Sequence, residues 1–318
     1  MAGLNALRRS LLTVLLLLLM MMMTMKYSLG RLIESSVLEF FAGSTDLKIE
    51  RADCSSLQLP QRRGNIPLPA EAFSRDRGLS VSNFMVASTR REPRVLLTLP
   101  AKFMGRVDRD GTFDSAGNSD NTYKRAKESQ SHDGIFIDVG GWIGDSSFPS
   151  AVLGIDTFVF EPVRYNTNLM HTGRLLNDCQ VQNHLMIINA AVGDFDGLST
   201  IYVSERADNT ADTKSQAVAN VGESQFDYTQ KVATVRLDSF FPSGTRVQNL
   251  KIDVQGSELK VLKGAKRLLR ENKGRCKLRL EMDENLLNRA GAGGSEIVAF
   301  MLSLGYRVVA KGADYDFE

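Results

Sequence analysis

One stretch decides the fold, Gly134-Ile-Phe-Ile-Asp-Val-Gly-Gly-Trp-Ile-Gly144. Its short apolar run ends in Asp138 and passes into a segment with three glycines, Gly140, Gly141 and Gly144. This pattern is typical of a buried parallel strand that leads through a tight turn into a helix. Glycines let the backbone approach a ligand closely, and a helix start adds unpaired N–H groups. The stretch therefore predicts a ligand site at this turn.

A second apolar run, Thr157–Phe160, ends in Glu161, roughly twenty residues beyond the glycine turn. An acidic residue at the end of the second strand is well placed to bind the hydroxyls of a ribose. The two signals together predict a cofactor that contains a nucleoside. Taken alone, Asp138 is also suited to capping the first helix, and Glu161 to a surface position.

From Gly134 onward, segments with strand and helix patterns alternate, which predicts a parallel sheet with helices on both faces. The expected strands are Ile135–Val139, Thr157–Phe160, Leu185–Ala190, Asn249–Val254 and Cys276–Met282. The expected helices are Ser147–Leu153, Arg164–Asn177, Ser257–Glu271 (with Ser257 as its cap) and Ser295–Leu304. Leu198–Val203 and Val232–Arg236 are expected to form an inserted antiparallel pair, and Asn83–Ala87 and Val95–Leu99 an upstream one.

The N-terminal segment 11–29 contains the apolar run Leu11–Met25, which is mostly leucine and methionine and follows Arg8 and Arg9. Its length and basic flank suit either a membrane anchor or a signal peptide that is cleaved near Ser28-Leu-Gly30. We favour an uncleaved anchor, with the basic tail in the cytoplasm and the rest of the chain in the lumen. This predicts a single-pass type II protein of the endoplasmic reticulum or Golgi; secretion after cleavage is the alternative, and a mitochondrial transit peptide is a third interpretation.

The domain plan that follows has five parts: a cytoplasmic tail at 1–10, the anchor or signal segment at 11–29, a stem or linker at 30–80, an N-terminal hairpin and mobile loop at 81–133, and a catalytic domain at 134–318. The net charge of +2 gives no electrostatic reason to expect nucleic acid as a partner. The cysteines have no metal-ligand spacing, so neither a zinc site nor a disulfide framework is expected. At most one disulfide is possible, and buried free thiols are favoured.

Several blocks, in their order and spacing, resemble the FkbM-type S-adenosylmethionine-dependent methyltransferases. They are Phe136-Ile-Asp-Val-Gly-Gly-Trp-Ile-Gly144, Val159-Phe-Glu-Pro162, Asn189-Ala-Ala-Val-Gly193, Val235-Arg-Leu-Asp-Ser239 and Lys251-Ile-Asp-Val-Gln-Gly-Ser-Glu-Leu-Lys-Val-Leu-Lys-Gly-Ala265. The resemblance implies a class I methyltransferase fold, which is a Rossmann-like and mostly parallel seven-stranded sheet. It also implies O-methylation of a hydroxyl, with a small molecule or glycan as the acceptor.

The resemblance also assigns site residues. Those expected to bind S-adenosylmethionine are Asp138, Gly140, Gly141, Gly144, Glu161, Pro162, Asn189 and Ala190. Asp253 ends the fourth expected strand, where the methyl group would point, and a carboxylate there can act as a general base. Asp253 is the first candidate for this role, and Glu258 and Glu281 are further candidates.

This chain departs from the family pattern at three positions in these blocks. The family usually has alanine at Gly141, asparagine at Trp142 and glutamate at Gln255. Gln255 keeps hydrogen bonding but lacks a negative charge, which opens a second hypothesis: a non-catalytic binding or scaffold protein with the same fold. A dinucleotide or nucleotide-sugar enzyme on a similar sheet is a third, although the turn lacks the usual glycine spacing. The chain also stops soon after Val309, so an incomplete last strand is expected.

Overall fold

The computed structural model describes residues 84–88, 95–100, 134–203, 214–215, 228–312 and 314–318. The tail, anchor and stem expected at 1–80, and the loop expected at Arg106–Asp133, lie outside these residues. Within the described residues, no helix combines the length and apolar character needed to cross a bilayer.

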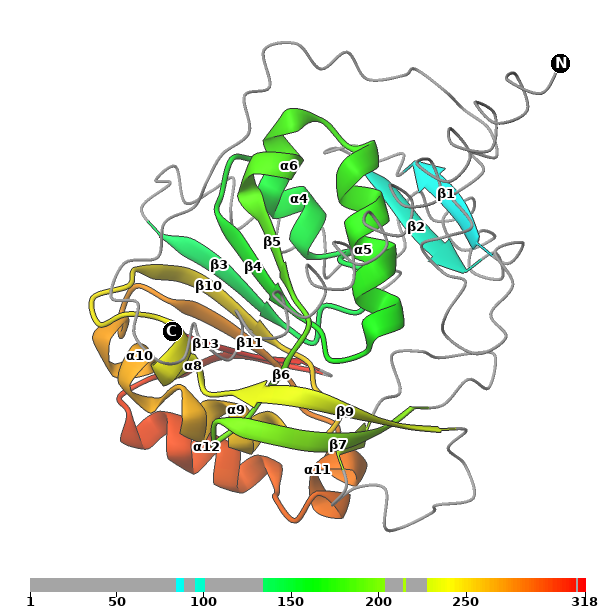
Figure 1. Ribbon diagram of the computed structural model, residues 1–318. Coiled ribbons are helices and arrows are strands. Elements are labelled where there is room, and N and C mark those ends of the chain that lie inside the picture. The colour runs from blue at the N-terminus through cyan, green and yellow to red at the C-terminus, as the bar shows by residue number, and fades with distance from the viewer. Residues whose placement is uncertain (1–83, 89–94, 101–133, 204–213, 216–227, 313) are drawn as a thin grey trace, which may run out of the picture. The chain divides into compact units, whose positions relative to one another are not determined.

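A seven-stranded sheet forms the centre of the fold, with the strand order β12-β13-β11-β10-β3-β4-β5 (Figure 1). The strands are β3 (Ile135–Val139), β4 (Thr157–Phe160), β5 (Leu185–Ile188), β10 (Val247–Ile252), β11 (Lys277–Glu281), β12 (Val308–Lys311) and β13 (Asp314–Phe317). Neighbours from β11 to β5 are parallel, and β13 is antiparallel to both β11 and β12. The class I methyltransferase-like fold is therefore confirmed. The expectation of an incomplete last strand is wrong, because β12 and β13 close the sheet as a hairpin.

Helices cover both faces of the sheet, as the alternating pattern predicts (Figure 1). One group consists of α4 (Ser147–Val152), α5 (Arg164–Leu176) and α6 (Cys179–His184). The other consists of α9 (Glu258–Gly264), α10 (Lys266–Glu271), α11 (Glu284–Arg289) and α12 (Gly294–Ser303). Pro149 lies in the first turn of α4, where a missing N–H is tolerated.

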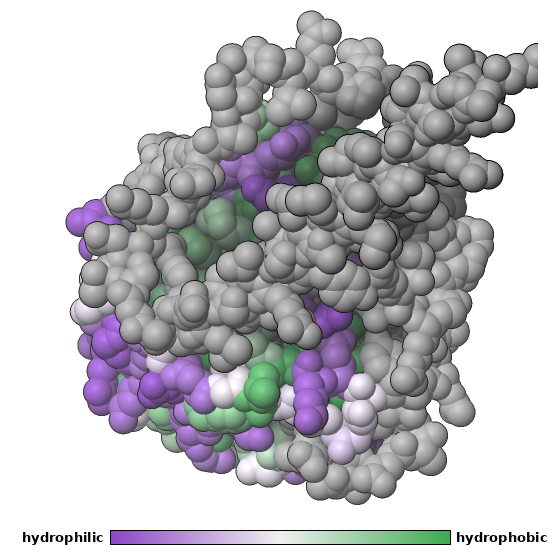
Figure 2. Space-filling model, in the orientation of Figure 1, coloured by the Kyte–Doolittle hydropathy of each residue, from purple (hydrophilic) through white to green (hydrophobic). Residues whose placement is uncertain are grey.

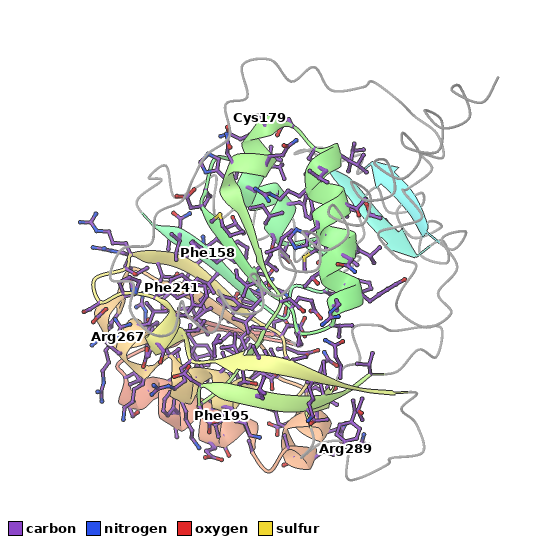
Figure 3. The ribbon with its side chains drawn as sticks, viewed as in Figure 1. Phe158, Cys179, Phe195, Phe241, Arg267 and Arg289 are labelled. Atoms are coloured by element: carbon purple, nitrogen blue, oxygen red, sulfur yellow. The ribbon has the colours of Figure 1, made fainter. Side chains whose placement is uncertain are left out.

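The core lies along the central strands: β10 is buried at every position, and β11 at alternate positions. In β10 and β11, Leu250, Ile252, Leu278 and Leu280 are buried side by side in register. Phe158 of β4 packs edge-to-face on Phe241, with ring centroids 5.1 Å apart (Figure 3). Outside the core, the surface over α10 and α12 is mainly hydrophilic in this view (Figure 2).

A separate four-stranded sheet contains the predicted insertion. It consists of β6 (Ala191–Val192), β9 (Tyr228–Val235), β7 (Gly197–Val203) and β8 (Lys214–Ser215), in that order. β7 and β9 are antiparallel, as expected, and β6 pairs with β9 in parallel.

The upstream hairpin β1 (Phe84–Ser88) and β2 (Leu96–Pro100) joins the main domain. Leu97 and Leu99 are buried in the same cluster as Ile143 and Phe148. The side chain of Asn177, just after α5, accepts a hydrogen bond from Leu96 N at 2.9 Å and donates to Leu96 O at 2.8 Å.

The expectation of free thiols is wrong for one cysteine. Cys179 is disulfide-bonded, whereas Cys276 is free and buried. Cys179 is the first residue of α6 (Figure 3) and is partly buried.

Candidate functional site

The glycine turn after β3 closes directly onto the end of β10. Gly140 has φ of +85°, and a Cβ built there would lie 1.8 Å from the carbonyl oxygen of Asp253. Gly144 has φ of +82°, and its Cβ would lie 2.6 Å from the ring of Phe148. Only glycine combines this backbone with this contact. The turn lies between the ends of β3 and β10, and the strand order of the sheet reverses between these two strands. Open α/β sheets bind ligands at such a point.

Gly141 is a glycine for a different reason. A Cβ there would lie 2.0 Å from Cγ2 of Val159, a buried residue of β4. The family that this sequence resembles usually has alanine at this position, and an alanine would not fit beside Val159.

Glu161 follows β4 and points back to the glycine turn. Its Oε2 accepts a hydrogen bond from Trp142 N at 3.0 Å, and its Oε1 accepts bonds from Val163 N at 2.9 Å and Asn166 Nδ2 at 3.1 Å. Burial raises the pKa of this carboxyl group to about 7, although these three donors act to lower it. A carboxylate oxygen can accept two hydrogen bonds. Oε2 therefore has a second lone pair besides the one that accepts from Trp142 N.

The other predicted cofactor residues lie around Glu161. Asn189 follows β5, and its Nδ2 donates to the carbonyl oxygens of Glu161 and Pro162 at 2.9 and 3.0 Å. Gln230 of β9 donates to the same Pro162 carbonyl at 3.0 Å. Ala190 is fully buried behind Asn189. The structure thus brings the predicted cofactor-binding residues together at one edge of the sheet.

A buried row of charges runs from β3 to β10. Asp138 is fully buried, accepts a hydrogen bond from Ser147 Oγ at 2.6 Å, and faces Lys251 in register. Nζ of Lys251 lies 3.5 Å from Asp138 Oδ1 and 3.5 Å from Asp253 Oδ2. Burial acts to lower the pKa of Lys251, but the two aspartates outweigh it and raise the pKa above its usual value. Lys251 therefore stays cationic between two carboxylates.

Asp253 is the exposed member of this row. Its side chain is 35% exposed, whereas that of Asp138 is 0% exposed. Burial acts to raise the pKa of Asp253, but Lys251 and hydrogen bonds from Glu281 and Gln255 lower it below the usual value. The side chain of Asp253 is thus partly exposed at the end of β10, and its surroundings favour the ionised form.

Gln255 bridges Asp253 to the next strand. Its Nε2 donates to Asp253 Oδ1 at 3.0 Å and to Glu281 Oε2 at 2.9 Å. Burial and the neighbouring Asp253 raise the pKa of Glu281 to about 9. Both causes favour the protonated form of Glu281.

Glu258 lies nearby but faces inward. It is 1% exposed, and its Oε1 accepts hydrogen bonds from Val254 N and Gly256 N, both at 3.1 Å. Ser257 occupies the N-cap of α9 but makes no capping hydrogen bond, so that expectation is wrong. The contacts of Glu258 fit a role in holding the turn after Asp253, and its predicted catalytic role stays a prediction.

Sequence patterns did not single out several residues of the site, among them Lys251 and Ser147. Lys251 carries a signal, because a lysine inside an apolar strand requires a charged partner when the strand is buried. Ser147 carries none, since its contact with Asp138 depends on the path of the turn. Within the described residues, no group of three or more His, Cys, Asp or Glu side chains is arranged to hold a metal ion.

Comparisons with known proteins bear on this site. A profile described as the methyltransferase FkbM domain matches residues 138–308. Among solved structures, the FkbM methyltransferase from Methylobacillus flagellatus KT is 17% identical with a TM-score of 0.38, and the match covers 58% of this chain and 43% of that chain. The magnesium protoporphyrin IX methyltransferase from Synechocystis PCC 6803 with bound SAM is 11% identical with a TM-score of 0.35, over 63% of this chain and 74% of that one.

A search of curated proteins found no match. The match to the Methylobacillus protein spans less than half of that protein's length. The methyltransferase FkbM profile, by contrast, covers more than half of the present 318-residue chain. The protein therefore belongs to the FkbM methyltransferase family.

Proposed function

We propose that this protein is an S-adenosylmethionine-dependent methyltransferase that methylates a hydroxyl group. The observation that carries the proposal is the meeting of three features at the carboxyl edge of the sheet: the glycine turn, the carboxylate of Glu161 and the exposed carboxylate of Asp253. The first two suit a nucleoside cofactor, and the third suits a hydroxyl acceptor.

The residues present fit the cofactor. Glu161 Oε2 would accept a hydrogen bond from a ribose hydroxyl, and Asn189 with Ala190 would border the adenine. Gly140 and Gly144 would let the backbone approach the methionine portion. When bound, S-adenosylmethionine would supply an activated methyl group on a sulfonium sulfur.

Asp253 would orient the acceptor and receive its proton. Methyl transfer to a hydroxyl mainly needs the oxygen to be aligned with the carbon and sulfur, so positioning is the largest contribution of the protein. Lys251 holds Asp253 Oδ2 from the buried side, and Gln255 holds Oδ1. The carboxylate is thereby fixed at the edge of the site, where an acceptor hydroxyl would donate to it.

We propose that the acceptor is a glycan or another secretory-pathway metabolite. We also propose that this chain is a type II membrane protein of the endoplasmic reticulum or Golgi. The apolar segment 11–29 and the preceding arginines support this topology. The disulfide at Cys179 also supports a lumenal site, because disulfides persist in oxidising compartments. Carbonate extraction of the expressed full chain should leave it in the membrane. A soluble product whose N-terminal sequence starts near Arg31 would contradict the anchor.

Cofactor binding tests the function directly. The full chain should bind S-adenosylmethionine and S-adenosylhomocysteine in calorimetry, and NAD should give no heat of binding. Glu161→Ala should weaken both ligands by about 1–3 kcal/mol, because a ribose hydroxyl would lose its acceptor. Glu296→Ala is the control, since this exposed acid on α12 has Lys263, at 3.7 Å, as its one ion-pair partner among the described residues. Equal affinity in Glu161→Ala and the control would contradict the assignment.

Gln255 favours a second candidate, the non-catalytic scaffold, because the family usually has glutamate at this position. The two candidates predict different results when methyl transfer from labelled S-adenosylmethionine to a secretory glycan fraction is measured. Transfer by the natural chain would support the enzyme. Transfer that appears only in Gln255→Glu would support the scaffold.

A further inference from the structure

The amide of Gln255 contacts two carboxyl groups at once. Its nitrogen carries two hydrogens, and the two hydrogen bonds, 3.0 Å to Asp253 and 2.9 Å to Glu281, use both. Asp253 follows β10, and Glu281 ends β11. A single side chain therefore joins the ends of two adjacent parallel strands through their acids.

Acids outnumber cations around this bridge. Lys251 faces the pair from β10 and is shared between Asp138 and Asp253. Arg279, on the same strand as Glu281, is bound to Asp316 at 3.0 Å and lies 3.9 Å from Asp314. Among the described residues, the other groups that act on the pair include two further acids, Glu258 of α9 and Asp314 of β13. Two full negative charges on Asp253 and Glu281 would thus share one cation that Asp138 already contacts.

We propose that Asp253 and Glu281 share one proton across the Gln255 bridge, with Glu281 holding it and Asp253 ionised. This inference rests on the proposed function, because it concerns the charge beside the methyl group that is transferred. Gln255 is then a positioning residue, which acts on the acceptor through the two acids that it joins.

The surroundings of the two acids explain which one keeps the proton. Lys251 contacts Asp253 at 3.5 Å and favours its ionised form. Among the described residues, no ion pair to Glu281 is found, and burial together with Asp253 raises the pKa of Glu281. At neutral pH the pair therefore carries one negative charge, and it gains a second when Glu281 ionises near pH 9.

Two ligands that differ by one charge can detect this step. S-adenosylmethionine carries a sulfonium cation, and S-adenosylhomocysteine has a neutral sulfur at the same position. Both share the ribose, the adenine and the amino-acid group, so the ratio of their affinities cancels pH effects at Glu161. A second charge on the pair should raise this ratio by about fivefold, the effect of one charge at roughly 8 Å and an effective dielectric constant of about 40.

The experiment measures both affinities through the fluorescence of Trp142, the only tryptophan in the chain, between pH 7 and pH 9.5. In the natural protein the ratio should rise as pH approaches 9. Glu281→Gln should remove the step, because the amide cannot ionise. Glu296→Gln removes the same charge from an exposed helix position and should keep the step. Gln255→Met should move the step to higher pH, because it removes donors that favour the ionised carboxylates.

Each outcome decides one point. If neither ligand binds the natural protein, the proposed function itself fails. If both bind but their ratio is constant with pH, the function stands and the shared proton is refuted. A step that remains in Glu281→Gln would assign it to another group. A step that Gln255→Met leaves at the same pH would show that the bridge does not set it. Should Glu281→Gln fail to fold, Gln255→Met decides instead, because Gln255 contacts both acids and its loss should move a step that belongs to them.

Discussion

Two residues at the candidate site, Trp142 and Gln255, have backbone conformations that side-chain-bearing residues rarely adopt. Their φ angles are +48° and +55°, and among the described residues no others outside glycine are positive. Such a conformation costs of order 1 kcal/mol. Each is held by bonds to an acid: the N–H of Trp142 donates to Glu161, and the amide of Gln255 donates to Asp253 and Glu281. These are also two of the positions that depart from the family pattern.

Gly141, where the family usually has alanine, is the third departure from the family pattern, and its steric cause can be tested. Gly141→Ala places a methyl group against Val159, whose Cγ2 would lie 2.0 Å away, so the free energy of unfolding should fall by about 1–3 kcal/mol. The double variant Gly141→Ala with Val159→Ala should be less destabilised than the sum of its single changes, since it removes the clash. Urea unfolding of the four proteins measures this coupling. Additive effects would show that the clash is not the cause.

Sequence patterns predicted the residues whose position depends only on their neighbours in the chain. Asp138, Glu161 and Asp253 follow apolar runs, so their location at strand ends could be predicted. The bridge from Gln255 to Glu281 joins residues 26 positions apart, and no local pattern encodes it. The contact of Gly141 with Val159 is likewise set by the pairing of β3 with β4.

At the scale of elements, tertiary contacts divide one helix that the sequence pattern predicts as continuous. The expected helix Ser257–Glu271 is divided at Ala265 into α9 and α10. Gly264 packs so closely on Gly193 that a Cβ would lie 1.9 Å from its carbonyl oxygen. Asp238 of α8 (Leu237–Phe240) then accepts hydrogen bonds from Arg267 N and Leu268 N, both at 2.8 Å, at the start of α10. Both contacts come from distant segments, so an apolar stripe alone could not reveal the division.

The hairpin β1–β2 depends on one side chain for part of its attachment. Asn177→Ala should leave both backbone groups of Leu96 without this partner and lower the free energy of unfolding by about 1–3 kcal/mol. Amide exchange at Leu96 should become faster in this variant. Asn288→Ala, at an exposed position of α11, is the control and should leave that exchange unchanged. Unaltered exchange in Asn177→Ala would show that apolar packing of Leu97 and Leu99 alone holds the strand.

At the scale of the whole molecule, the acids of the carboxyl edge have a common effect on stability. Burial raises the pKa values of Glu161, Glu258, Glu281 and Asp314. These residues come from four separate segments, and only the folded sheet brings them to one edge. A ligand site and a pH-sensitive stability therefore arise from the same arrangement of strands.

The sign of this dependence follows from proton binding. Glu161 and Glu281 have pKa values of about 7 and about 9 in the folded protein, against 4.5 when unfolded. Between pH 4.5 and these values the folded protein binds more protons than the unfolded chain, so its free energy of unfolding falls as pH rises. Urea unfolding under non-reducing conditions, which keep the Cys179 disulfide, should show a fall of about 3 kcal/mol or more from pH 5 to pH 9. This figure is reduced from the full pKa shifts because Glu281 is partly exposed. Glu281→Gln should flatten the decline above pH 7, and Glu296→Gln should retain it; a free energy of unfolding that rises over this range would contradict the raised pKa values.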